Sequence, residues 1–483
     1  EEVLAGVVRR YLADEAAPRS YTVHGDTTSI KLQGAYEAAS QQHEPTPARG
    51  FSKDRRPDLK QLVFGLSLHG AVGIPLTSAI MAGNTVDSQA NRLNLDQLAD
   101  LLPEEDEVTV VGDCKLVDAR TLGQLALHGF HFISLLPGNY NLREELIGEV
   151  RGQEELPELA RQPGRRKADP PRIYRGRSFK RPFTIGVGEA GDNQKRTVQR
   201  RFLVVESTQL AQQEEASLQR KVKKDREAYQ KLLKQASKKP FACEPDALAA
   251  RDTVVKGLRL HRHHLEVEAQ HIPRKRARRG RPRVDDPPVL ETVYRLVERA
   301  PLEPLEDKLE ESRFYARHFV LVTDHLDEEV WPDERVLAEY RHQHMIEGHT
   351  GFRWLKNIAR VAPVFLHTPK RIAALGVLFV LALMVRNYIQ FELRRRLVET
   401  HSTIPDRLRK DTQAPTAETA FIPFAPVSVV RIYESDTLIQ RRLTPLSEPA
   451  MTVLRMLDID PSVFSTPPPR RFIPAGLPPT SGT

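Results

Sequence analysis

The N-terminal part of the chain alternates between two patterns of apolar residues. Runs rich in β-branched, aromatic and aliphatic side chains predict strands. They cover residues 21–32, 62–70, 73–81, 107–116 and 130–137. Apolar residues at helical spacing predict helices at 88–102, which we expect Ser88 to cap, and at 119–129. Strands that alternate with helices are typical of an α/β layered fold.

The segment after residue 139 breaks this alternation. It is long and charged, with a predicted β-hairpin followed by a charged helix through SLQRKVKKDREAYQKLLKQASKK. The α/β pattern then resumes with a strand at 316–324, a helix at 333–347 and an apolar helix at 372–391. The order predicts one α/β domain split by a large mixed insertion domain. The predicted parts are 1–139, the insertion 140–315, 316–400, and a C-terminal extension 401–483 with a disordered Pro-rich tail.

The most apolar run is IAALGVLFVLALMV, residues 372–385. Its fourteen residues are too few to span a bilayer, so we expect a buried helix and no membrane partner. Two distant cysteines and no visible signal peptide fit a reducing cytoplasm. The 483 residues are 40% hydrophobic and 28% charged, enough for a packed core, and the net charge of +8 suits a polyanionic partner.

Three acids occupy informative places in these elements. Asp26 lies in the middle of YTVHGDTTSIKL, although aspartate is disfavoured in strands. Asp113 ends a later strand, and Glu347 lies near the end of the helix that follows the insertion. Acids that converge in this way can bind two hard divalent cations, as phosphodiester chemistry requires. The structural alternative is that Asp113 caps a turn and Asp26 lies on the surface of an edge strand.

An ordered series of motifs resembles the DDE transposases of bacterial insertion sequences, in the subgroup with a β-rich insertion in the catalytic domain. The first motifs are GDTTSI, SKDRRPDLKQLVFGL, GIPL followed by GNTVD, and VVGDCKLVD. RRFLVVES, YRHQHMIEGHTGFRWLK and VAPVFLHTPKRIAALGVLFVLALMV follow in the same order. The resemblance covers most of residues 20–395.

The resemblance implies an RNase H-like mixed sheet flanked by helices. Asp26, Asp113 and Glu347 would be the catalytic acids and would hold two Mg²⁺ (or Mn²⁺) ions. The implied activity is cleavage at the ends of the mobile element and joining of the 3′-hydroxyl to target DNA. The implied partners are double-stranded DNA and, in the DNA complex, a second copy of the chain. The implied location is the bacterial cytoplasm, on the nucleoid when bound to DNA.

The helix of the third acid departs from the family pattern of Tyr, two residues, Arg, three residues, Glu, six residues, Lys. Tyr340 and Glu347 fit, whereas the Arg position is Gln343 and the Lys position is Trp354. Tyr340, Gln343 and Glu347 share one helix face. Lys356 follows two residues later, which turns it by about 200° if the helix continues. Its role in holding phosphate is therefore in question.

Basic residues supply the predicted DNA contacts. The densest run is RKRARRGRPR, which contains an AT-hook-like GRP core that could enter a narrow minor groove or contact phosphates without sequence preference. The predicted DNA-binding residues are Tyr340, Arg353, Lys356, Arg279, Arg281 and Arg283. Two alternatives to the enzyme stay open. One is a truncated or inactive transposase remnant that only binds DNA, and the other is a basic architectural DNA-binding protein.

Overall fold

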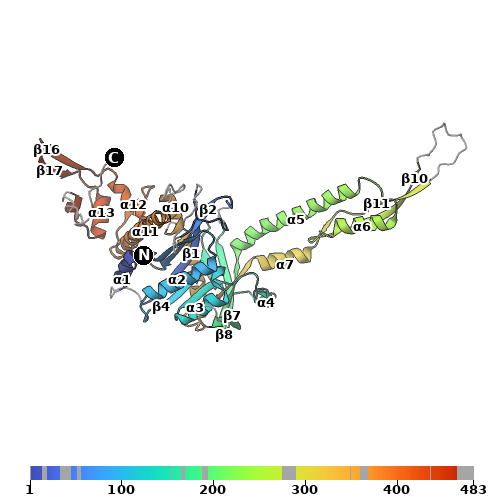
Figure 1. Cartoon of the computed structure of the whole chain (residues 1–483), viewed down its shortest axis with the longest axis horizontal. Coiled ribbons are helices and arrows are strands. Elements are labelled where there is room, and N and C mark those ends of the chain that lie inside the picture. Colours follow the sequence, from blue (N-terminus) through green and yellow to red (C-terminus); the bar gives the residue numbers. More distant parts are fainter. Residues whose placement is uncertain are drawn as a thin grey trace. The chain divides into compact units, whose positions relative to one another are not determined.

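The computed structural model describes residues 2–12, 19–32, 45–51, 56–153, 155–164, 169–187, 194–274, 290–348, 350–358, 368–435 and 437–464 (Figure 1). Contacts divide the chain into two compact units. Unit 1 contains residues 1–134, 183–198 and 339–483, and unit 2 contains residues 135–182 and 199–338. The domain boundaries expected from the sequence stay a prediction, because these units are defined by contacts alone.

The sheet of unit 1 is mixed and contains the five strands predicted at the N-terminal end. They are β1 (Ser20–Leu32), β2 (Lys60–His69), β3 (Pro75–Ala82), β4 (Glu107–Gly112) and β5 (His131–Leu135). Their order is β3-β2-β1-β4-β5, with antiparallel β1–β2 and β2–β3 pairs and parallel β1–β4 and β4–β5 pairs. Since β1 has a neighbour on each side, the alternative that places Asp26 on an edge strand is wrong.

Helices cover both faces of this sheet, and adjacent residues of β2 show which helix covers which face. Val63 packs with Ala90 of α2 (Asp87–Leu101). Leu62 packs with Ile372 of α11 (Pro369–Glu399). Successive side chains of a strand point to opposite faces, so α2 and α11 lie on opposite faces of the sheet. The predicted α/β layering is therefore confirmed.

Two local predictions are wrong. Helix α2 begins at Asp87 after Val86, and no side chain of the described residues caps it, so Ser88 is not the cap. The strand predicted at 107–116 ends at Gly112, because a 3₁₀ turn, η1 (Cys114–Leu116), follows Asp113. Helix α3 (Ala119–Leu127) then begins after Asp118, whose carboxylate accepts the Arg120 and Thr121 N–H groups.

Helix α11 is longer than the sequence indicated. It has 31 residues, and Arg371–Glu399 is long and apolar enough to cross a membrane by length and composition. The expectation that this apolar segment is too short to span a bilayer is therefore wrong. In unit 1 the helix packs on β3, and its buried Arg386 pairs with Glu418 at 2.7 Å. A paired, buried charge near the middle of the helix fits a helix in a protein core.

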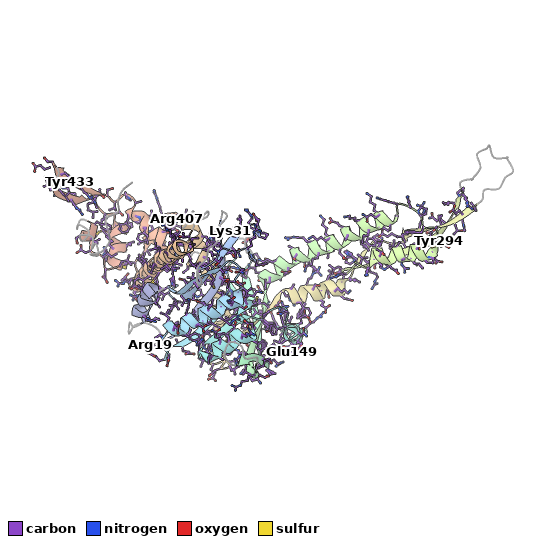
Figure 2. All side chains as sticks on the ribbon, viewed as in Figure 1. Arg19, Lys31, Glu149, Tyr294, Arg407 and Tyr433 are labelled. Carbon is purple, nitrogen blue, oxygen red and sulfur yellow. The ribbon has the colours of Figure 1, made fainter. Side chains whose placement is uncertain are left out.

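The C-terminal part of unit 1 packs around the end of α11. Leu393 and Leu397 of α11 share a small core with Ile404, Ala420 and Val453. Tyr433 is exposed on the β16–β17 hairpin (Figure 2). The remaining elements of unit 1 are α1 (Glu2–Leu12), α9 (His344–Glu347), α10 (Phe352–Ile358), β14 (Ile404–Pro405), β15 (Asp411–Thr412), α12 (Ala417–Phe421), η2 (Ile422–Phe424), β16 (Val429–Glu434), β17 (Thr437–Leu443), α13 (Glu448–Met456) and η3 (Pro461–Phe464).

Unit 2 contains the predicted charged helix and most of the predicted hairpin, whose residues 183–198 belong to unit 1. Its strands follow the order β13 (His318–Thr323), β8 (Gln194–Ser207), β7 (Arg172–Val187) and β6 (Glu158–Gln162). Tyr294 lies on β11, whose inner residues share a core with α5 and α6 (Figure 2). The other elements are α4 (Asn141–Glu149), α5 (Thr208–Ala236), α6 (Glu244–Val255), β9 (His261–Arg262), β10 (Leu265–Pro273), β11 (Leu290–Glu298), β12 (Glu303–Pro304) and α7 (Glu306–Ala316). Helix α8 (Asp333–His342) contributes to both units.

Candidate active site

The first two predicted acids lie next to each other on neighbouring strands. The parallel β1–β4 register pairs His24 with Val111, and continuing it by two residues places Asp26 beside Asp113. Asp113 has an extended backbone, so its side chain follows the alternation of β4 and points to the same face as Asp26. Neighbouring strands are about 4.8 Å apart. The two carboxylates therefore emerge together where β4 ends.

Both carboxylates are held by backbone donors. The Thr27 N–H donates to Asp26 Oδ1 at 2.6 Å, and the Lys115 N–H donates to Asp113 Oδ1 at 2.9 Å. Asp113 is thus the cap of η1, as its structural alternative proposed. The Asp113 carbonyl oxygen also accepts the Ser134 hydroxyl at 2.7 Å, which ties the site to β5. A carboxylate has two oxygens, so the cap and a second role for Asp113 do not exclude each other.

The helix predicted at 333–347 is divided in two. Helix α8 ends at His342 and α9 runs from His344 to Glu347. The Gln343 N–H donates to the Tyr340 carbonyl at 3.1 Å, an i to i−3 bond that tightens the backbone into a 3₁₀ turn. Helix α9 contacts β1 and β2, so Glu347 belongs to an element that packs on the strand of Asp26.

Tyr340 connects the third acid to the second. Burial raises the pKa of Tyr340 to about 12, and the negative charges of Asp113, Cys114 and Glu347 add to this rise. Both Asp113 and Glu347 are therefore close enough to act on one phenol group. The raised pKa keeps the Tyr340 hydroxyl protonated at every physiological pH. A protonated phenol at this position can donate a hydrogen bond to a carboxylate or a phosphate oxygen.

A buried amide fixes the chain just after Glu347. The Asn387 side chain of α11 donates to the Thr350 carbonyl at 2.8 Å and to the Gly73 carbonyl at 2.7 Å. Gly73 has φ +73°, and a Cβ there would lie 2.6 Å from the Thr350 side chain. One side chain thus joins the β2–β3 turn to the loop that follows α9. Asn387 is a positioning residue that the sequence reading missed, since only its place inside an apolar helix marks it.

The departure from the family pattern has a structural explanation. The helix does not continue, because α9 ends at Glu347 and α10 begins at Phe352, so the rotation expected for Lys356 does not apply. Trp354, at the family's Lys position, is buried and its indole N–H donates to Glu418 at 3.0 Å. Arg353 and Lys356 are exposed and three residues apart, so they share the outer face of α10.

The separation of the three acids bears on the kind of metal site that they could form. Among the described residues, the oxygens of Asp26, Asp113 and Glu347 do not all lie within 4.8 Å of one another. A two-metal site does not require that, because its ions are about 4 Å apart and each adds metal–oxygen bonds of about 2.1 Å. An all-carboxylate donor set is also the one that Mg²⁺ prefers.

Some predicted residues lie outside the described part of the chain. These are Arg279, Arg281 and Arg283 of the basic run, and Ser52 to Arg55 of the SKDRRPDLKQ motif. The expected Pro-rich tail after residue 464 lies outside it as well. Comparisons with known proteins give no further guide, since no protein-family model matches the chain and no curated protein matches it. The function therefore has to be inferred from the site.

Proposed function

We propose that the chain is a DNA transposase with an RNase H-like catalytic domain. It would cut DNA at the ends of its own mobile element and join the freed 3′-hydroxyl to target DNA. The observation that supports this proposal is the parallel β1–β4 register, which runs toward Asp26 and Asp113 where β4 ends, together with Tyr340, whose pKa both Asp113 and Glu347 raise. The mixed sheet with helices on both faces supports the fold that the resemblance implies.

Asp26, Asp113 and Glu347 would hold two Mg²⁺ (or Mn²⁺) ions. When bound, such ions neutralise phosphate charge and make water or a 3′-hydroxyl a better nucleophile at neutral pH. The task of the protein is then to hold its own groups in place, since phosphoryl transfer depends mostly on positioning and electrostatics. Backbone N–H groups fix the rotamers of Asp26 and Asp113, and Asn387 fixes the loop behind Glu347.

Tyr340 would act as a hydrogen-bond donor beside the acids. Its raised pKa excludes a role as a general base near neutral pH, because the hydroxyl keeps its proton. Arg353 and Lys356 on the outer face of α10 would contact backbone phosphates, in a chain with net charge +8. A homodimer on paired DNA ends and a cytoplasmic location belong to the same proposal.

A matched pair of aspartate variants tests the proposal. The substrate is double-stranded DNA that carries the inverted repeats flanking the gene, incubated with the full chain and Mg²⁺. Asp113→Asn keeps the shape and the turn cap but removes the charge, and we expect cleavage to fall at least about 100-fold because a metal ligand is lost. The control, Asp118→Asn, removes a charge at the cap of α3 and should leave cleavage unchanged.

The outcomes separate the enzyme from its alternatives. Cleavage that is equal in the wild type and in Asp113→Asn contradicts the assignment of the acids. If neither protein cleaves and both bind the repeats specifically, the chain is an inactive remnant. If both bind all DNA alike and neither cleaves, the architectural alternative holds.

A further inference from the structure

A second cluster of metal-binding side chains lies beside the acids. It consists of His24 on β1 and of Glu339 and His342 on the last turn of α8. One ligand atom from each of the three residues lies within 4.8 Å of the other two. All three residues belong to unit 1. His24 and Asp26 are two residues apart on one strand, so their side chains point to the same face of the sheet.

His24 is buried with an unused nitrogen. Its side chain is 0% exposed, its Nε2 atom lies 3.5 Å from the Thr22 hydroxyl, and its Nδ1 atom has no hydrogen-bond partner among the described residues. A buried polar atom without a partner costs stability, and proteins rarely keep one without a reason. A neutral imidazole is the form that binds a metal.

Thr22 connects two of the three ligands. Its hydroxyl donates to Glu339 Oε2 at 3.0 Å and lies 3.5 Å from His24 Nε2. This is the kind of contact that orients a ligating carboxylate. Gly70 leaves the space for it, because a Cβ at that residue would lie 2.1 Å from Thr22 Oγ1 and 3.2 Å from His24 Nε2.

The cluster can be reached from solvent. His342 is exposed and lines a pocket of about 540 Å³, together with Gly70, Met345 and Arg394. An ion could therefore reach the cluster without opening of the sheet. Zinc–ligand bonds of about 2.0–2.2 Å allow ligand atoms to lie at most about 4.4 Å apart. The exposed His342 has the freedom to close the small remaining distance.

We propose that His24, Glu339 and His342 form a binding site for one borderline divalent transition-metal ion of the Zn²⁺ class. Two imidazoles and one carboxylate are a ligand set that zinc uses, whereas Mg²⁺ prefers oxygen ligands. The ion would join the last turn of α8 to β1. Since Tyr340 lies between Glu339 and His342 in the chain, the ion would also position Tyr340 against the acids. The site itself does not depend on the proposed DNA chemistry.

Titration with Co²⁺ and Zn²⁺ tests the site directly. The purified full chain is freed of metal with a chelator and titrated with Co²⁺ alone, and its visible absorption is followed. A competing Zn²⁺ titration then gives the affinity for zinc. We expect one equivalent of Co²⁺ to produce an intense visible band that Zn²⁺ abolishes. His342→Ala and Glu339→Gln should each weaken Zn²⁺ binding at least about 100-fold, as loss of a direct ligand exceeds loss of a supporting group.

His344→Ala is the matched control. It removes an exposed histidine two residues from His342 that does not belong to the cluster, and it should leave the affinity unchanged. Circular dichroism of all variants checks that they fold. The site is refuted if the wild type binds no Co²⁺ or Zn²⁺, or if His342→Ala and Glu339→Gln bind as tightly as the wild type. Asp113→Asn should keep the Co²⁺ band, which separates failure of this site from failure of the proposed enzyme.

Discussion

The acids and the histidine cluster occupy the same face of the same strand, yet their surroundings differ. Asp26 is half-buried and pairs with Leu66 of β2, at a level where β4 has ended. His24 is fully buried and pairs with Leu68 on one side and Val111 on the other. The same strand thus presents a half-buried carboxylate and, two residues earlier, a fully buried imidazole. The two side chains differ in exposure because β4 covers the level of His24 and ends before the level of Asp26.

The largest expected effect belongs to Asp26→Asn, which should impair the acids and spare the histidine cluster. Asp26→Asn keeps the acceptor for the Thr27 N–H but removes the charge, so Mg²⁺-dependent cleavage should fall at least about 100-fold. Co²⁺ binding at the histidine cluster should change by less than about threefold, because its first ligands remain. Parallel cleavage assays and Co²⁺ titrations check this. Loss of both activities would show that the two clusters form one site.

Gly70→Ala should damage the histidine cluster through packing. The added methyl group meets Thr22 Oγ1 at 2.1 Å, and overpacking of this kind costs about 1–3 kcal/mol of unfolding free energy. Urea unfolding of the metal-free protein measures it. Gly6→Ala in α1 is the control, since no atom of the described residues lies within 4 Å of the added Cβ. It should be neutral or stabilising by up to about 1 kcal/mol. Equal stability of Gly70→Ala and the wild type would mean that the Thr22 side chain shifts away from the added methyl group at no cost in unfolding free energy.

Low pH should lower the unfolding free energy of the metal-free protein through the buried histidines of the cluster. Burial lowers the pKa of His24 from 6.5 to about 3 and that of His69 to about 4. Partial desolvation also lowers the pKa of His342, although nearby Glu339 opposes this shift. A lowered pKa means that the fold prefers the neutral ring. Its contribution is therefore complete above pH 6.5 and is lost as the pH falls toward 3.

The comparison of two proteins isolates the part that His24 contributes to this acid effect. The unfolding free energy of the wild type should fall between pH 7 and pH 4 by more than that of His24→Asn. The result is the difference between the two slopes of unfolding free energy against pH, so it does not depend on the absolute stability of His24→Asn. Identical slopes would show that His24 is not the buried titrating group.

The smallest effect concerns the outer face of α10. Lys356→Ala should weaken binding of the full chain to DNA only a few-fold at low salt, because it removes one phosphate contact. The slope of the logarithm of affinity against that of salt concentration should fall by about 0.9. Lys410→Ala, an exposed lysine elsewhere in unit 1, is the control. An unchanged slope for Lys356→Ala would remove α10 from the DNA-binding surface.

Much of the fold around the acids could be predicted, because it follows from local patterns. The patterns at 21–32 and 107–116 predict two strands, both of which the structure contains, and Asp26 stands out as an acid inside one of them. The division of the third-acid helix at Gln343 could not be predicted. Gln343 keeps helical backbone angles of φ −52° and ψ −27°, so the residue itself does not mark the break in the helix. The full length of α11 could not be predicted either. Its more polar C-terminal end extends beyond the apolar run and packs against the C-terminal segment, a contact that the local pattern does not show.

The available side chains and the alternation of each strand follow from residues close together in the chain. The spacing of two residues places Asp26 and His24 on one face of β1. Which residues each of them contacts depends on how distant segments pack together. The parallel register brings Asp113 to Asp26, and the last turn of α8 brings Glu339 and His342 to His24 across more than 300 residues. These contacts depend on how α8 packs on β1, which no local sequence pattern predicts.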